Sequence, residues 1–339
     1  MGKRNDVEGC ILSGMTEFDL IAHYFTRKPK HAAMGVGDDC ALINTTPGTQ
    51  LAISSDMLVE GRHFFHDVSP YSLGHKALAV NLSDLAACGA MPVAFTLALA
   101  LPRIDEAWLQ EFSRGLWALA DAHGCELIGG DTTQGPLNIC ITVFGEVPRG
   151  QALLRSGAKV GDDIYVSGTL GDARLALDAL QGHLQLPPDV LAQARLRLEQ
   201  PTPRVALGAA LRGVATSCID ISDGLAGDLG HILKASGVGA QVDTEITTNL
   251  IAASAHIDWA RGQFGTLKQL KTVFSGGDDY ELAFTAPPDA RGAVQAVSTS
   301  SQTPITRIGV IQSQPGLRLV DGRGQPVTAQ FSSFDHFAA

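Results

Sequence analysis

The chain has 339 residues and a mass of 35.6 kDa, with 45% hydrophobic and 18% charged residues. This length exceeds what one compact core usually organises, and the composition differs from that of disordered chains, so we expect two globular domains. The formal net charge of -10 leaves no basic stripe for nucleic acid or an anionic membrane, and we expect neither as a partner.

The cysteines and the N-terminus suggest a cytoplasmic protein. Six cysteines are present and no two of them form a Cys-x-x-Cys pair, which argues against a zinc or redox motif and fits a reducing compartment. The N-terminus lacks the apolar core of a signal peptide, and Gly89 and Pro92 interrupt the longest apolar stretch. We therefore predict neither secretion nor a membrane span.

Turn and capping residues divide the first half of the chain into elements. Residues 1–15 lack periodicity and are predicted to be a flexible tail, after which Thr16 caps a helical pattern. A hairpin is expected around the Pro47-Gly48 turn, and Asp105 is expected to cap a helix that Gly124 ends. The predicted helices cover residues 73–88 and 106–123, and the predicted strands cover 39–43, 50–54, 93–101, 126–130 and 137–147.

A second unit is predicted to begin after the Pro148-Arg149-Gly150 turn, which divides the chain into domains 16–148 and 149–339. Helices alternate with strands in this half, and no repeat of fixed period is present. The fold class is therefore α/β or α+β. The predicted helices are 172–181, 191–199, 203–211 and 224–235, and the predicted strands are 161–168, 239–243, 281–285 and 305–311.

Short acidic clusters recur at the predicted ends of strands and helices. Carboxylates and hydroxyls in such positions suit Mg²⁺, which completes its coordination with water and phosphate oxygens. Each cluster alone is typical of an ordinary turn or solvated helix face, but together they suggest one site for a polyanion. The clusters are Gly37-Asp38-Asp39, Ser54-Ser55-Asp56, Asp84, Gly129-Gly130-Asp131, Asp220-Ile-Ser222-Asp223 and Ser275-Gly-Gly-Asp278-Asp279.

The common nucleotide and nucleophile motifs are absent from the sequence. It contains no P-loop, protein-kinase or Rossmann signature and no Gly-x-Ser-x-Gly, so metal ions rather than a lysine cradle would have to neutralise bound phosphates. Arg155 is either a cationic clamp or a surface arginine, and His63 is either a substrate contact or a structural histidine.

The motifs taken in order resemble the thiamine-monophosphate kinase family, within the ATP-binding superfamily typified by aminoimidazole ribonucleotide synthetase. The resemblance extends from about Glu17 to Phe337. It departs from the usual pattern at Ser55, Asp278 and Phe334. The motifs that carry it include VGDDCALI, LAISSDMLVEGRHF, GHKALAVNLSDLAACGAMP, LIGGDTTQGPL, ALLRSGAKVGDD, SCIDISDGLAGDLG, SGGDDYELAFT and SFDHF.

The resemblance implies a two-domain fold whose first α/β domain pairs its mixed sheet with a dimer mate, followed by a second α/β domain. It implies transfer of the ATP γ-phosphoryl group to thiamine phosphate, the final step of thiamine diphosphate biosynthesis, with several Mg²⁺ ions. Asp38, Asp56, Asp84, Asp131 and Asp220 are then expected to be catalytic. The implied metal ligands are Asp38, Ser54, Ser55, Asp56, Asp84, Asp131, Asp220 and Asp223; Gly130, Asp131, Arg155 and Ser222 would contact ATP, and His63, Asp278 and Phe334 would contact thiamine phosphate.

Two alternatives remain open from the sequence. One is another ATP-using enzyme of the same superfamily, such as a selenophosphate or aminoimidazole ribonucleotide synthetase. The other is a non-catalytic module that binds divalent metal, although no EF-hand loop is present. A kinase agrees with the lack of an obvious base, because a phosphate oxygen that is already ionised needs none.

Overall fold

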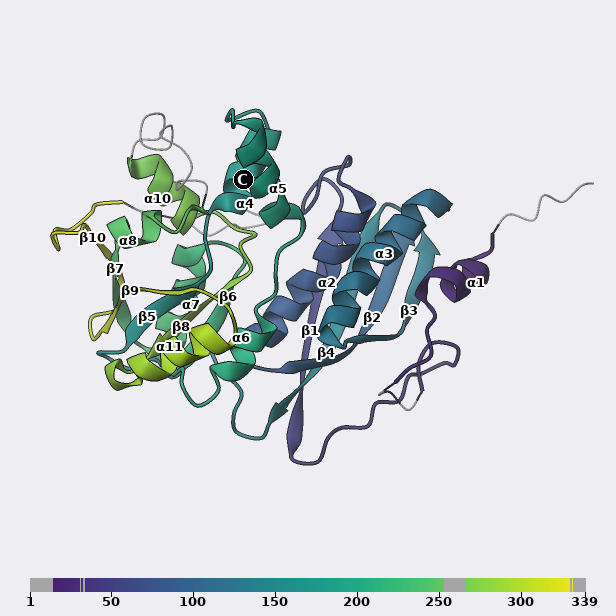
Figure 1. Ribbon diagram of the computed structural model, residues 1–339, viewed down its shortest axis with the longest axis horizontal. Helices are drawn as coiled ribbons and strands as arrows, with labels where there is room; N and C mark the ends of the chain where they lie inside the picture. Colours follow the sequence, from purple (N-terminus) through teal and green to yellow (C-terminus); the bar gives the residue numbers. More distant parts are fainter. Residues whose placement is uncertain (1–14, 31, 33, 253–265, 330, 332–339) are drawn as a thin grey trace, which may run out of the picture.

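The computed structural model describes residues 15–339 except 31, 33, 253–265, 330 and 332–339. Almost all of the predicted tail and the candidate residue Phe334 therefore lie outside the described residues. Two α/β units stand side by side, each built on its own sheet, with helix α2 (Pro70–Ala87) at the boundary between them (Figure 1).

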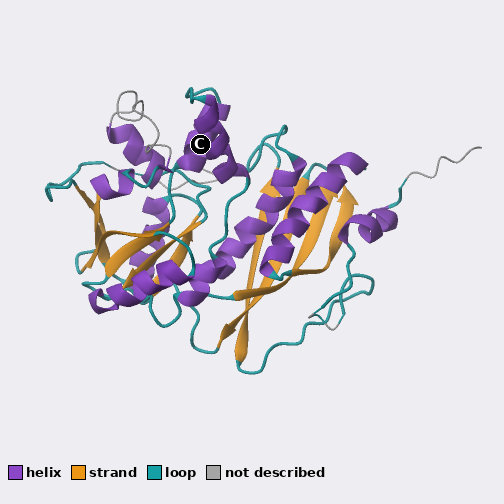
Figure 2. Cartoon of the chain, in the orientation of Figure 1, coloured by secondary structure: helices purple, strands orange, loops and turns teal. Residues whose placement is uncertain are grey.

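The first sheet has four strands, and its helices cover one face only (Figure 2). Its order is β1-β4-β2-β3, antiparallel except for the parallel pair β2 and β3. α2 and α3 (Glu106–His123) pack on one face. The opposite face exposes apolar side chains, among them Ile53 at 61%. The strands are β1 (Thr49–Val59), β2 (Met91–Leu101), β3 (Glu126–Gln134) and β4 (Asn138–Pro148).

The predicted hairpin across Pro47-Gly48 is wrong. Residues 39–43 form no strand, and only an isolated bridge joins Met34 to Leu42. β1 instead pairs along its whole length with β4, far along the chain. A long, regular pairing satisfies many more backbone groups than a short local hairpin with polar ends, so the distant partner prevails.

The capping residues predict α3 correctly. The Asp105 side chain accepts a hydrogen bond from the Trp108 amide at the N-terminus, and Gly124 adopts a left-handed conformation (φ 60°) at the C-terminus. Thr16 likewise forms a capping box with Asp19 at the start of α1 (Glu17–Leu20), and a π-helical turn (Ile21–Phe25) follows directly.

The second sheet has six strands in the order β10-β7-β9-β5-β8-β6. The sequence predicted β5 (Asp163–Ser167), β7 (Gly239–Asp243), β8 (Glu281–Ala286) and β9 (Ile305–Gln312), but missed β6 (Ser217–Ile221) and β10 (Gly316–Val320). β6 carries Ser217 and Asp220 within five fully buried residues, so its polar content resembles that of a loop. The helices are α4 (Asp172–Leu180), α5 (Pro188–Glu199), α6 (Val205–Ala210), α7 (Leu225–Ser236), α8 (Thr244–Thr248), α10 (Thr266–Phe274) and α11 (Arg291–Ser300), with a 3-10 turn at Pro288–Ala290.

α2 connects the two units. Its leucines Leu78, Leu82 and Leu85 are at most 1% exposed, and the helix packs against β1 and β4 as well as against α6 and β6. One apolar cluster consequently runs from the first sheet through α2 to Leu207 and Phe284 in the second half. The predicted division at residues 148 and 149 stays a prediction, because this core is shared across it.

Candidate active site

Four carboxylates from separate parts of the chain converge between the two sheets. Asp56 on β1, Asp84 on α2, Asp220 on β6 and Asp223 just after β6 line one cavity of about 290 Å³. Three other predicted site residues, His63, Ser222 and Asp278, line the same cavity, as does Arg174, which was not predicted. The structure thus assembles most of the acidic clusters into a single cleft.

Neighbouring hydroxyl and amide groups orient the carboxylates from the first half. The Ser54 hydroxyl donates a hydrogen bond to Asp84 Oδ2, which joins β1 to α2. The Asp56 amide donates to Asn81 Oδ1 at 3.0 Å. Asn81 is itself 1% exposed and donates to the Ala77 carbonyl, so a rigid helix supports the strand at this point.

The second-half carboxylates are held by residues that the sequence analysis did not select. Ser83 on α2 donates to Asp220 Oδ2 at 2.7 Å, across the boundary between the units. The backbone amides of Ser222 and Asp223 both donate to Asp228 Oδ2 at 3.1 Å. Asp228, in the first turn of α7, therefore shapes the segment that presents Ser222 and Asp223 to the cleft. In the sequence, the only signal for this role was that Asp228 follows Asp223 closely, at the start of the predicted helix.

Burial and mutual repulsion make these carboxyl groups weak acids. Burial, with the charges of Asp84 and Asp223, raises the pKa of Asp56 to about 6. Burial and the charge of Asp84 raise the pKa of Asp220 to about 8. Burial also raises the pKa of Asp84, against the opposing effects of the Ser54 hydrogen bond and of Arg155. The cleft therefore gathers carboxyl groups whose ionised form is disfavoured without a bound cation, an arrangement typical of sites that bind divalent ions.

Mg²⁺ fits this donor set in kind, since the residues offer carboxylate and hydroxyl oxygens. Within the described part of the chain, however, no three His, Cys, Asp or Glu residues are close enough together to form a ready-made metal site. Phosphate oxygens, water or residues of a second chain would have to complete the coordination.

A second cluster lies at the opposite edge of the first sheet. Asp38, Gly130 and Asp131 line a different cavity, beside β3 and the start of α1. The cross-strand register sets Asp56 on β1 and Gly130 on β3 three strands apart, roughly 14 Å at the usual strand spacing. One chain therefore does not bring Asp131 to the Asp56 cleft.

Two expected turns are parts of strands. Ser54, Ser55 and Asp56 lie in the middle of β1, so alternation sends Ser54 and Asp56 toward α2 and Ser55 to the open face, where its hydroxyl is 2.9 Å from that of Thr142. Gly130 and Asp131 likewise lie within β3, which runs on to Gln134. A Cβ at Gly130 would come within 1.8 Å of the Leu97 carbonyl oxygen, which gives this glycine a packing role.

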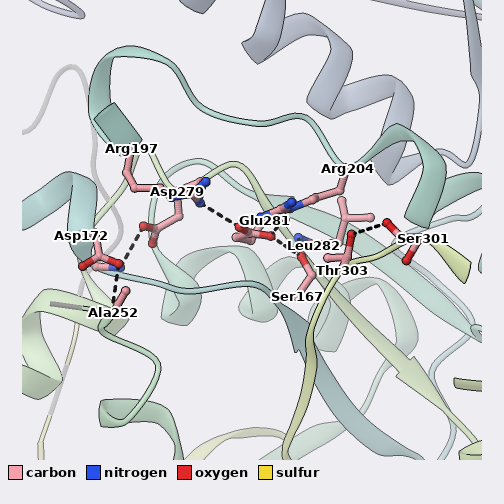
Figure 3. A network of polar contacts seen from close by, with 11 residues as sticks. Ser167, Asp172, Arg197, Arg204, Ala252, Asp279, Glu281, Leu282, Ser301 and Thr303 are labelled. Atoms are coloured by element: carbon pink, nitrogen blue, oxygen red, sulfur yellow. Dashed lines mark hydrogen bonds and ion pairs between the residues drawn. The ribbon is translucent and has the colours of Figure 1, made fainter. Parts of the chain in front are cut away.

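The segment before β8 is anchored by a buried ionic network (Figure 3). Glu281 is 0% exposed and pairs with Arg197 at 2.8 Å and with Arg204 at 2.5 Å, while the Ser167 hydroxyl donates a further hydrogen bond to it. Arg197 also donates to the Asp279 carbonyl at 3.1 Å. The network fixes the backbone beside Asp278, the residue that the sequence resemblance assigns to thiamine phosphate binding.

The remaining candidates are placed as follows. Arg155 is exposed, yet close enough to Asp84 for its charge to lower the pKa of that carboxyl group. His63 accepts a hydrogen bond from the Val59 amide at Nδ1, 3.0 Å away, and lines the cleft.

Sequence reasoning missed Lys76, which forms an ion pair with Asp278, although a lysine within an otherwise apolar helical stretch was a usable signal. No described helix is long and apolar enough to cross a membrane.

The fold and the acidic cleft define an ATP-binding protein of the AIR synthase class. Residues 37–147 match the family "AIR synthase related protein, N-terminal domain", and residues 159–322 match "AIR synthase related protein, C-terminal domain". Together these matches cover most of the chain, which belongs to this family. The two-domain fold expected from the sequence is confirmed.

Within this class, the chain belongs to the thiamine-monophosphate kinases. It is 48% identical to the thiamine-monophosphate kinase of Salmonella typhimurium, over 95% of this chain and 98% of that protein. The crystal structure of thiamine-monophosphate kinase from Stenotrophomonas maltophilia is 44% identical, with a TM-score of 0.79 over 88% of this chain and 92% of that one. A structure described as AaThiL complexed with AMPPCP and TMP is 27% identical, with a TM-score of 0.73 over 87% and 89% of the two chains.

Proposed function

We propose that the chain transfers the γ-phosphoryl group of ATP directly to the phosphate of thiamine phosphate, giving thiamine diphosphate and ADP. The observation that carries this proposal is the convergence of Asp56, Asp84, Asp220 and Asp223 on one cleft that His63 and Asp278 also line. Membership of the family identifies the substrates. The cleft offers the carboxylates that can hold divalent ions between two phosphate groups.

The residues of the cleft support in-line transfer without a covalent intermediate. The acceptor phosphate oxygen is ionised at neutral pH, so no general base is needed. When bound, Mg²⁺ would neutralise the facing phosphates. Asp56, Asp84, Asp220 and Asp223 would hold these ions, while the rigid contacts through Ser83 and Asn81 keep the carboxylates in place.

The remaining roles follow the family pattern. Arg155 and Ser222 lie beside the Asp84–Asp223 cleft and are proposed to contact ATP. His63 and Asp278, which line the same cleft, are proposed to contact thiamine phosphate, together with Phe334 from the C-terminal segment. Gly130 with Asp131 is proposed as a further ATP contact, and Asp38, Ser54, Ser55 and Asp131 as further metal ligands.

A homodimer would reconcile these roles with the geometry. Asp38 and Asp131 lie at the β3 edge of the first sheet, far from Asp56 at the β1 edge. The open face between these edges exposes Ile53 at 61% and Met57 at 52%. We propose that two copies pair through this face and that Asp38 and Asp131 of one copy complete the cleft of the other. The apolar strand Val93–Leu101, which by itself favours such a contact only weakly, turns Leu97, Leu99 and Leu101 into the interior of the chain.

A direct assay tests the proposed reaction. Purified protein with ATP, Mg²⁺ and thiamine phosphate should form thiamine diphosphate, whereas unphosphorylated thiamine should give no product. Incubation with γ-labelled ATP alone should leave no label on the denatured protein. Absence of thiamine diphosphate would refute the function, and stoichiometric labelling of a side chain would refute direct transfer.

A further inference from the structure

Lys76 is a buried lysine in the middle of α2. It lies four residues before Val80 and eight before Asp84, so the three side chains form one stripe of the helix. Val80 and Asp84 line the acidic cleft, and Lys76 lines a smaller adjoining cavity of about 100 Å³. Only 4% of Lys76 is exposed, and an ammonium group is costly to bury unless it has partners.

Its contacts connect Asp278 and His63, two of the three residues proposed to contact thiamine phosphate. Lys76 Nζ lies 2.6 Å from Asp278 Oδ1 and 3.5 Å from the His63 carbonyl oxygen. The lysine side chain is 5% exposed, whereas that of Asp278 is 32% exposed. The ion pair therefore holds one carboxylate oxygen from the protein side and leaves part of the carboxylate open to the cavity.

The backbone of Asp278 is constrained independently of this ion pair. Asp278 has a φ of 64° and Tyr280 a φ of 50°, both in the left-handed region, which non-glycine residues seldom adopt. The Asp278 amide donates to the Ser222 carbonyl and the Tyr280 amide to the Ile221 carbonyl, each at 2.8 Å. The backbone is thus docked on the segment that carries Ser222. The side chain is held at Oδ1 by Lys76 at 2.6 Å and, more weakly, by the Tyr280 hydroxyl at 3.5 Å.

The cavity around this pair has the chemistry of the acceptor's organic half. It is lined by aromatic and aliphatic side chains, including Phe64, Phe65 and Leu73, and by the Lys76–Asp278 pair. A cationic heteroaromatic ring would gain apolar contact there together with a nearby negative charge. Asp278 lines the acidic cleft as well as this cavity. Without Lys76, its carboxylate could turn away from the cavity and toward cations bound in the cleft.

We propose that Lys76 is a positioning residue for the acceptor: it holds Asp278 through Oδ1, so that the rest of the carboxylate faces the cationic ring of thiamine phosphate. This inference rests on the proposed acceptor role of Asp278. Two other roles make different predictions. A lysine that contacts the acceptor phosphate directly would act independently of Asp278, and a purely structural lysine would affect both substrates alike.

A double-mutant cycle tests the proposal. Lys76→Met, Asp278→Asn and the double variant are prepared in the full chain, with Lys234→Met, at an exposed position of α7, as a matched control. Binding of thiamine phosphate is measured by calorimetry with Mg²⁺ and a non-hydrolysable ATP analogue, and KM is measured for both substrates. Each single variant should weaken thiamine phosphate binding about tenfold, equivalent to about 1.4 kcal/mol. The double variant should bind no more weakly than the weaker single variant, and the KM for ATP should stay within about twofold.

Additive losses in the double variant would overturn the proposal, as would equal losses for ATP and thiamine phosphate. Unchanged acceptor binding in Lys76→Met would overturn it as well. If Lys76→Met does not fold, Lys76→Gln keeps a donor without the charge and should show a smaller loss that also disappears in the Asp278→Asn background. Wild-type protein that forms no thiamine diphosphate would instead refute the proposed function.

Discussion

At the scale of single residues, the cleft concentrates carboxyl groups whose ionised form is disfavoured by burial and by their mutual repulsion. Asp220 shows this most clearly, because it is 6% exposed, receives a hydrogen bond from Ser83 and has a pKa raised to about 8. Asp56 and Asp228 are shifted in the same direction, with pKa values of about 6 and 7, mainly through burial. Such groups favour cation binding at the expense of metal-free stability.

Replacing single carboxylates should lower turnover strongly and leave the fold intact. Asp56→Asn, Asp131→Asn and Asp220→Asn each remove one negative charge with little change in volume, so kcat should fall by about two orders of magnitude or more, as expected for metal-site residues. Steady-state assays and circular dichroism measure the two properties. Near-normal turnover in two of the three variants would show that these residues are structural.

The raised pKa of Asp220 also predicts how stability depends on pH. In metal-free protein the folded state keeps this proton up to about pH 8, whereas the unfolded chain releases it near pH 3.8, the ordinary pKa of an aspartate. Stability should therefore decrease as pH rises from about 4 to about 8. Asp220→Asn stays neutral, so at pH 8 it should melt at least roughly 2–4 °C above wild type, the shift expected for each 1 kcal/mol or so of stability.

Thermal melts with EDTA at pH 5 and pH 8 measure this difference, which should nearly disappear at pH 5. Excess Mg²⁺ should raise the melting temperature of wild type more than that of Asp220→Asn. A variant that melts below wild type at pH 8 without metal would show that Asp220 is stabilising in its charged form.

At the scale of elements, β8 and the segment that precedes it connect stability to the site. Glu281 begins β8 between two arginines, and Asp278 lies three residues earlier in the cleft. Arg197 extends from α5 to the Asp279 carbonyl, so the helical pair α4 and α5 supports the same segment. A strand end anchored in this way can keep two left-handed non-glycine residues in place.

Neutralising Glu281 should therefore be costly. Glu281→Gln leaves two partly buried arginines facing a neutral side chain, and a loss of about 3–5 kcal/mol is typical of a broken buried ion pair. Urea unfolding measures the change. Glu111→Gln is a suitable control, because its pair with Arg114 is largely exposed and should contribute less than about 1 kcal/mol. Equal effects of the two substitutions would contradict the structural role assigned to the network.

At the scale of the whole molecule, the arrangement of the sheet makes one chain insufficient for the proposed site. Asp56 and Asp131 lie on opposite edge strands, and the apolar face between those strands is uncovered in the single chain. Pairing of two such faces would bury Ile53 and Met57 and bring the β3 edge of one copy to the β1 edge of the other.

Complementation between inactive variants tests this arrangement. Asp131→Asn and Asp220→Asn should each be inactive alone, but a mixture that has exchanged subunits contains dimers with one intact site. Activity should recover to roughly a quarter of the wild-type value with random exchange. No recovery despite verified exchange would show that both residues act within the same chain.

The open sheet face can be tested separately by light scattering. Wild type should have twice the 35.6 kDa chain mass, and Ile53→Lys should be monomeric because it would bury a charge in the contact. A wild-type monomer at micromolar concentration would refute the dimer.

The fold class, the family and most elements with strong local signals could be predicted from the amino-acid sequence. α3 is the clearest case, since its length, its Asp105 cap and its Gly124 stop all follow from residues within the helix and its ends. Ordered motifs over nearly the whole chain were enough to predict the kinase family. These properties depend on neighbouring residues, which the sequence displays directly.

How the acidic clusters are divided, and what supports them, became visible only in the folded chain. The pairing of β1 with β4 places Ser55 and Asp56 on opposite faces, and the strand order separates Asp56 from Asp131. Lys76 and Asp278 are 202 residues apart, and Glu281 receives its arginine partners from α5 and from the start of α6. Such contacts depend on strand partners and burial, which arise from long-range packing and have no local signature in the chain.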